Sequence, residues 1–136
     1  MASTTETLER SSSHPSYVKS VGQDKYQSHD YYLVDELLSE EHLMIRDAAR
    51  TWVKREVSPI IEDYAQRAEF PRHIVQGLAE VGAFGPVIPV EYGGQGLDYT
   101  AYGIIMQELE RADSGVRSFA SVQGALVMYP LSLIHI

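Results

Sequence analysis

Apolar and polar residues follow one another with helical spacing from about residue 39 onward. Ser39 is a good N-cap residue, and Glu40 and Glu41 follow it in the first turn, where the helix dipole favours acidic side chains. Apolar residues then recur three and four positions apart and form one stripe: Ile45, Ala48, Ala49, Trp52 and Val53. This pattern predicts a first helix that begins near Ser39 and buries one face.

Two more helices are predicted in the first half of the chain. The second restarts at Ser58 as the cap, with Pro59 at the first helical position, where its missing N–H group is not needed. Its apolar residues keep the helical spacing: Ile60, Ile61, Tyr64, Ala65 and Ala68. The third opens at Pro71 and stops at Gly82, because glycine readily takes the left-handed conformation that ends a helix.

The second half of the chain predicts a loop and two helices. Glycine and proline punctuate residues 82–97, which is typical of a loop. Asp98 then caps a fourth helix that reaches about Arg111, and a fifth helix follows Asp113 and runs toward Pro130. No alternating pattern of useful length predicts a strand. The expected fold class is therefore all-α, with five helices.

Residues 1–29 differ from the rest of the chain. They are polar and show almost no apolar periodicity, so they cannot bury enough surface to offset the entropy lost on ordering. We expect a disordered polar arm over residues 1–29 and one helical domain over residues 30–130. A chain of 136 residues with 44% hydrophobic residues is long enough for one such domain with a modest core.

Charge and residue usage narrow the class of protein. Eleven Lys and Arg against 19 Asp and Glu give a net charge of −8, so neither nucleic acid nor an anionic membrane is an expected partner. The absence of cysteine excludes disulfides, thiolate chemistry and cysteine-based zinc sites. No apolar run approaches the ~20 residues that span a bilayer. The N-terminus has no hydrophobic signal core, and Glu6 and Glu9 fit a transit peptide poorly, so we expect a cytoplasmic, bacterial protein.

The glycine-rich residues 93–96 invite a phosphate-binding interpretation. They lack the Gly-Lys-Ser/Thr ending of a phosphate-binding loop. Tyr99 also stands where a dinucleotide fingerprint needs its third glycine, and no strand comes before. A plain turn is the expected structure.

Two other clusters of polar residues also have simple explanations. Glu69 and His73 are four residues apart, but no third ligand is nearby, so no metal site is expected. Glu108, Glu110 and Arg111 are compatible with acid–base work, yet a solvated helix face with local ion pairs is the commoner arrangement.

The fifth helix carries the strongest candidate for a binding site. Arg117 and Ser121 are one turn apart and face the same way. Small and apolar residues extend this stripe: Gly124, Ala125 and Met128. The stripe suits a ligand with an anionic head and a hydrocarbon body, because the planar fork of arginine holds a carboxylate by two parallel hydrogen bonds. The alternative is that Arg117 pairs with Asp113, four residues earlier, and that the small residues serve helix packing.

Longer runs in the second half resemble a known family. Residues 89–96 (PVEYGGQG) and residues 108–115 (ELERADSG) resemble a loop and a helix of the acyl-CoA dehydrogenases. Residues 116–123 (VRSFASVQ) and residues 126–130 (LVMYP) are similar to the glutaryl-CoA dehydrogenase branch of that family. The resemblance covers about residues 39–130.

This resemblance implies a function for the fifth helix. In the glutaryl branch, the residues that match Arg117 and Ser121 contact the free carboxylate of glutaryl-CoA, and the one that matches Ser118 lines the same pocket. The family uses FAD and a glutamate base, and the glutaryl branch forms crotonyl-CoA. An electron-transfer flavoprotein as partner and a homotetramer are also implied. The β-domain that binds FAD and the C-terminal helices that carry the base are not in this chain. No catalytic residue is therefore assigned, and the fragment alone is not expected to turn over substrate.

The last residues depart from the family. Residues 131–136 read LSLIHI, which the codons CTG-TCT-CTT-ATA-CAC-ATC of a transposon end used as a sequencing adapter also encode. We therefore expect residues 131–136 to be a non-native tail. A genuine apolar helix end is the alternative.

Two other functions stay open at this point. One is a dehydrogenase or oxidase for monocarboxylic acyl-CoA, in which Arg117 has a structural role. The other belongs to a different class, a stand-alone helical module that binds a partner and has no catalysis. The short chain favours the module, and the resemblance favours an enzyme.

Overall fold

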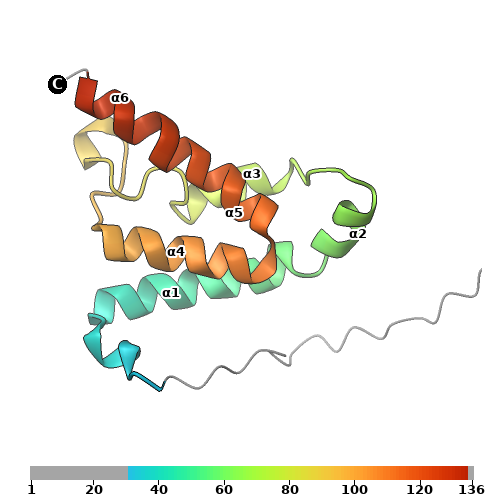
Figure 1. Cartoon of the computed structure of the whole chain (residues 1–136), viewed down its shortest axis with the longest axis horizontal. Helices are drawn as coiled ribbons and strands as arrows, with labels where there is room; N and C mark the ends of the chain where they lie inside the picture. The colour runs from blue at the N-terminus through green and yellow to red at the C-terminus, as the bar shows by residue number, and fades with distance from the viewer. Residues whose placement is uncertain (1–30, 135–136) are drawn as a thin grey trace, which may run out of the picture.

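The structure is a computed structural model that describes residues 31–134, and within this range it is helical without a strand (Figure 1). The six α-helices are, in order, α1 (Glu40–Trp52), α2 (Ile61–Gln66), α3 (Ile74–Glu80), α4 (Tyr99–Ala112), α5 (Ser114–Ser121) and α6 (Tyr129–Ile134). A π-helical segment, Val122–Met128, joins α5 to α6, so these form the single fifth helix that the sequence predicts. The all-α fold class is confirmed, and the expected arm over residues 1–29 lies outside the described residues.

Helix α1 begins where the sequence predicts. The Ser39 hydroxyl accepts a hydrogen bond from the His42 N–H (3.2 Å), and the Ser39 N–H donates to His42 Nδ1 (3.3 Å). This is a capping box in which histidine takes the place that glutamate or glutamine usually holds. A short 3₁₀ turn, Val34–Leu37, precedes the helix, and Asp35 binds Arg46 of α1 at 2.6 Å.

The predicted start of the second helix is wrong. A π-helical segment, Val53–Val57, extends α1, and the Ser58 N–H donates to the Val53 carbonyl at 3.0 Å. Ser58 therefore closes the first helix instead of capping the next one. Helix α2 begins at Ile61, with Ile60 at the cap position and no side-chain cap.

Helix α3 starts later than predicted but ends as predicted. Pro71 begins a turn, closed by the Ile74 N–H on its carbonyl at 3.0 Å, and the α-helix itself begins at Ile74. At the other end Gly82 has a φ of 75°, and the Ala83 N–H donates to the Leu78 carbonyl at 2.9 Å. This bond closes a Schellman motif, in which a left-handed glycine satisfies the last carbonyls of a helix.

Helices α4 and α5 each begin at an aspartate. The carboxylate of Asp98 accepts the Ala101 N–H, and that of Asp113 accepts the Val116 N–H, both at 2.8 Å. Asp98 is the predicted cap of α4. In the π-helical segment after α5 the Tyr129 N–H donates to the Gly124 carbonyl, five residues earlier. The wider turn comes just before Pro130, whose ring does not fit inside a regular α-helix.

The core lies between α1, α3, α4 and α5. Figure 1 shows α1 and α4 side by side with both N-termini at the same end, and α5 packs on α4. The buried cluster comprises Trp52, Val53, Val57, Ile74, Leu78, Ala83, Ile105, Met106, Leu109, Val116 and Ala120. Ala48, Ala65 and Ala68, predicted on buried faces, are exposed. None of the described helices is long and apolar enough to cross a membrane.

Trp52 needs a glycine opposite it. A Cβ atom added to Gly77 of α3 would lie 2.7 Å from Cζ2 and Nε1 of the indole, well inside normal contact distance. The missing side chain lets α3 approach α1 closely enough for the indole to be buried to 6% exposure.

One charged pair lies in the core between α1 and α4. Glu108 is 2% exposed, and Arg50 holds it from α1 by two hydrogen bonds, Nε to Oε2 at 3.0 Å and Nη2 to Oε1 at 2.9 Å. Arg111 lies farther away, with Nε 3.7 Å from Oε1. The prediction that Glu108 belongs to a solvated helix face is therefore wrong. A buried carboxylate must be paired and hydrogen-bonded, and the bidentate arginine meets both needs.

The loop before α4 is closed by its own backbone. The N–H groups of Gly96 and Leu97 donate to the carbonyls of Ile88 (2.8 Å) and Pro86 (2.7 Å), and a 3₁₀ turn, Val90–Tyr92, lies inside the loop. Gly94 packs directly on Ile88, so that a Cβ atom at position 94 would overlap the Ile88 carbonyl.

Glu108→Gln is expected to lower the free energy of unfolding by about 3 kcal/mol, because it removes the buried carboxylate that accepts both hydrogen bonds from Arg50. Urea denaturation followed by circular dichroism measures the loss. The matched control is Glu69→Gln at an exposed ion pair with Arg67, for which we expect less than about 1 kcal/mol. Equal losses in the two variants would contradict the structural role of the buried pair.

Two glycine-to-alanine substitutions, one in the loop and one on α4, are expected to change the stability of the protein in opposite directions. Gly94→Ala should destabilise the protein, since the Ile88 carbonyl must move to admit the methyl group. Gly103→Ala, on the exposed side of α4 with open space around it, should stabilise it by about 1 kcal/mol through helix propensity. Thermal unfolding of the two variants should shift in opposite directions, and a shift in the same direction would count against this packing.

Candidate functional site

The three residues predicted to bind a ligand all lie on α5. Arg117 and Ser118 are half-buried, and so is Ser121 at the end of the helix. The Ser121 hydroxyl donates to the Ser118 carbonyl at 3.2 Å, so the two serines are in contact through the backbone of one turn. The Arg117 side chain, in contrast to that of Ser121, makes its hydrogen bond to a residue of α4.

Arg117 is bound to Glu110, a partner that the sequence analysis did not identify. Arg117 Nε donates to Glu110 Oε2 at 2.6 Å, and the Ser114 hydroxyl donates to Glu110 Oε1, also at 2.6 Å. Asp113, the partner considered from the sequence, caps α5 with its carboxylate. The i, i+4 spacing of Glu110 and Ser114 was a usable signal, but the pair with Arg117 crosses a helix break and has no simple spacing.

The electrostatics of this network keep the carboxylate ionised. The Ser114 hydroxyl, and after it the Arg117 guanidinium, hold the pKa of Glu110 below its ordinary value. The side chain of Arg117 is 36% exposed, so it remains open to solvent on one side. On α4, burial raises the pKa of Tyr102, and the positive charge of Arg117 partly opposes this shift. Tyr102 therefore shares the electrostatic environment of Arg117.

Ser118 faces an open hollow with largely apolar walls. The other residues that line it are Phe84, Phe119, Val122 and Gln123. The Phe119 ring lies 4.7 Å from that of Phe70 and 5.9 Å from that of Phe84, centroid to centroid, so aromatic rings form one wall. Among the side chains that line the hollow, those of Ser118 and Gln123 carry hydrogen-bonding groups. Such a surface suits an apolar group with a polar end.

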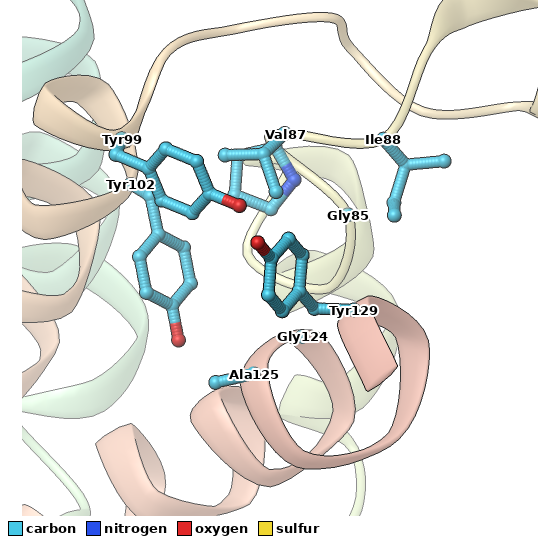
Figure 2. A pocket seen from close by; sticks show the side chains of 9 residues that line it. Gly85, Val87, Ile88, Tyr99, Tyr102, Gly124, Ala125 and Tyr129 are labelled. Carbon is cyan, nitrogen blue, oxygen red and sulfur yellow. The ribbon is translucent and has the colours of Figure 1, made fainter. Parts of the chain in front are cut away.

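A second, smaller pocket lies farther along the same helix (Figure 2). It holds about 70 Å³, and Tyr99, Tyr102, Gly124, Ala125 and Tyr129 are among its lining residues. The rings of Tyr99 and Tyr129 meet edge to face at 5.9 Å, with their hydroxyls close together in Figure 2. The hydrogen bond to Tyr129, followed by burial, raises the pKa of Tyr99. The side chain of Tyr102 points its hydroxyl away from this pair.

The stripe that the sequence predicts from Arg117 to Met128 therefore lies in two different environments. Arg117 belongs to a polar network with α4, whereas Gly124 and Ala125 line the tyrosine pocket. A π-helical segment, whose turns are wider than those of an α-helix, begins at Val122, between these two parts of the stripe. Spacing based on a regular α-helix fails beyond Ser121.

The described residues do not supply a cradle for the diphosphate of a flavin cofactor at the glycine-rich loop. A phosphate site of this kind needs free backbone N–H groups. Here the N–H groups of Gly94, Gln95 and Gly96 donate to carbonyls of the same loop. Gly93 and Gly96 have positive φ angles, as in the plain turn that the sequence predicts. Between residues 31 and 134 no three metal-ligating side chains come together.

Comparison with known proteins places these elements in a family. Residues 39–134 match the family "Acyl-CoA dehydrogenase, N-terminal domain". The chain is 38% identical over 96 residues to a 3-(aryl)acrylate reductase of Clostridium sporogenes, covering 71% of this chain and 26% of the relative. It is 33% identical over 94 residues to the mitochondrial short-chain specific acyl-CoA dehydrogenase of Bos taurus, covering 69% of this chain and 23% of that one.

A solved structure is similar over the same region. The crystal structure of glutaryl-CoA dehydrogenase from Mycobacterium smegmatis superposes with a TM-score of 0.67 at 39% identity, covering 73% of this chain and 26% of that one. The chain thus spans about a quarter of the length of these relatives. On the family match and the shared helical fold, the chain belongs to the acyl-CoA dehydrogenase family and contains the N-terminal helical domain of that family.

Proposed function

We propose that the whole protein oxidises glutaryl-CoA and decarboxylates it to crotonyl-CoA. The observation that carries this proposal is Arg117, a half-exposed cation one residue before Ser118, which lines the open apolar hollow on α5. The similarity to a glutaryl-CoA dehydrogenase at 39% identity supports it. A dicarboxylate tail needs a cation where it enters a protein, since a buried unpaired carboxylate is very costly.

In this proposal Glu110 orients Arg117 and leaves part of the guanidinium for substrate. Glu110 occupies the Nε edge, so the substrate carboxylate binds the Nη groups, which a planar guanidinium still offers as donors. Ser121 contacts the same carboxylate, and Ser118 lines the pocket of the acyl chain. Because Glu110 is held in turn by Ser114, the arginine is positioned before substrate arrives.

The remaining chemistry is proposed for other parts of the protein. Bound FAD would supply the acceptor for the β-hydride of the acyl thioester, and a glutamate base in another part of the protein would take the α-proton. No described residue is assigned to either task. An electron-transfer flavoprotein as electron acceptor, a homotetramer and a location in the bacterial cytoplasm belong to the same proposal.

A second candidate is an acyl-CoA dehydrogenase, oxidase or reductase for monocarboxylic or aryl substrates. It is favoured by the short bond between Arg117 and Glu110, which already balances the arginine charge, and by relatives named for short-chain acyl-CoA and for arylacrylates. A stand-alone binding module is the third candidate. Reading the source DNA beyond the codon for Pro130 separates the module from the enzymes, since only an enzyme needs a frame that continues into further domains. The same read tests whether residues 131–136 are native.

Arg117→Ala in the full-length enzyme should lower the ratio of kcat/KM for glutaryl-CoA to kcat/KM for butyryl-CoA by at least about 30-fold, because it leaves the substrate carboxylate without its cation. Steady-state assays with both thioesters and an artificial electron acceptor give the ratio. The matched control is Arg67→Ala, which removes an exposed arginine paired with Glu69, and it should leave the ratio unchanged. An unchanged ratio in Arg117→Ala would favour the monocarboxylic or aryl candidate.

A further inference from the structure

The first turns of α1 and α4 meet at one histidine. His42, in the first turn of α1, has its Nε2 atom 3.1 Å and 3.0 Å from the two carboxylate oxygens of Asp98, the cap residue of α4. Its other ring nitrogen, Nδ1, accepts the Ser39 N–H at 3.3 Å. The side chain is 16% exposed. Both ring nitrogens are therefore engaged, one by each helix.

These two bonds determine where the protons of the ring are. Nδ1 accepts a hydrogen bond, so it carries no proton, and Nε2 faces a carboxylate, so it carries one. A second proton has only Nδ1 to bind, and there it meets the Ser39 N–H, which is also a donor. Protonation therefore breaks half of the capping box, while it turns the Asp98 contact into an ion pair.

The groups around the His42 ring have opposite effects on a positive charge there. On the α4 side, Asp98 favours it. On α1, Glu40 and Glu41 share the first turn with His42, and Arg46 follows one turn later, bound to Asp35 of the preceding 3₁₀ turn. The N-termini of two helices point at the ring, and a helix N-terminus disfavours a cation.

We propose that His42 is a proton-sensitive part of the capping box of α1, and that its ring is bonded to Asp98 of α4 in both charge states. In the neutral form the ring caps α1 and is bonded to Asp98. In the charged form the ring loses its bond to the Ser39 N–H and stays bonded to Asp98, so α1 keeps only the half of its capping box that the Ser39 hydroxyl forms with the His42 N–H.

The test is a pH titration of the 136-residue chain from pH 8 to 5 by nuclear magnetic resonance. At pH 8 the ring nitrogens of His42 should give the pattern of the Nε2–H tautomer. As the ring gains its second proton, the Ser39 amide signal should shift toward that of a solvent-bonded amide. The Ala101 amide, bonded to Asp98, should shift at the same midpoint.

The control is His42→Gln, which restores the common Ser-x-x-Gln capping box but does not titrate. In this variant both amide signals should stay fixed across the range. The proposal is overturned if the ring is the Nδ1–H tautomer at pH 8, if the ring titrates while the Ser39 amide does not move, or if the two amides titrate equally in His42→Gln.

Discussion

The carboxylate of Glu108 lies in an apolar core, and it tolerates that place only because Arg50 reaches it from α1 with two hydrogen bonds. An ionised group at 2% exposure has lost nearly all its water, so the spacing of α1 and α4 must allow both hydrogen bonds of this pair. Ile105 and Leu109, which lie on the same helix as Glu108, belong to the buried apolar cluster. With α4 fixed in this way, Glu110, two residues farther on, lies on the side of α5 and holds Arg117.

The limits of the helices could be predicted where a side chain or a glycine sets them. Ser39, Asp98 and Gly82 act as the sequence predicts, because capping depends on one residue and its nearest neighbours along the chain. The start of α2 could not be predicted, since the π-helical segment before Ser58 has no sequence signature comparable to a cap. The exposed alanines at 48, 65 and 68 have a related cause. An alanine fits either face of a helix, so its position in a helical pattern says little about burial.

In the candidate site, too, the local features could be predicted and the tertiary contacts could not. The helix that carries Arg117, Ser118 and Ser121 follows from Asp113 and from spacing, so their common position on α5 was accessible from sequence. Their partners were not. A single sequence indicates local pairs, and Asp113 is the local acid, whereas Glu110 reaches Arg117 only because α4 and α5 fold back on each other. The burial of Glu108 and the bond from His42 to Asp98 also depend on tertiary contacts. Arg50 and Glu108 are 58 residues apart in the chain, and His42 and Asp98 are 56 residues apart.

The contact between Trp52 and Gly77 has an evolutionary consequence. The residue at each position limits which residues the other position can accept. A side chain at position 77 requires a smaller ring at position 52. A smaller ring at position 52 leaves a void beside the glycine. A single change at either position therefore lowers stability. Lineages that differ here are expected to differ at both positions together, and the pair is inherited as a unit.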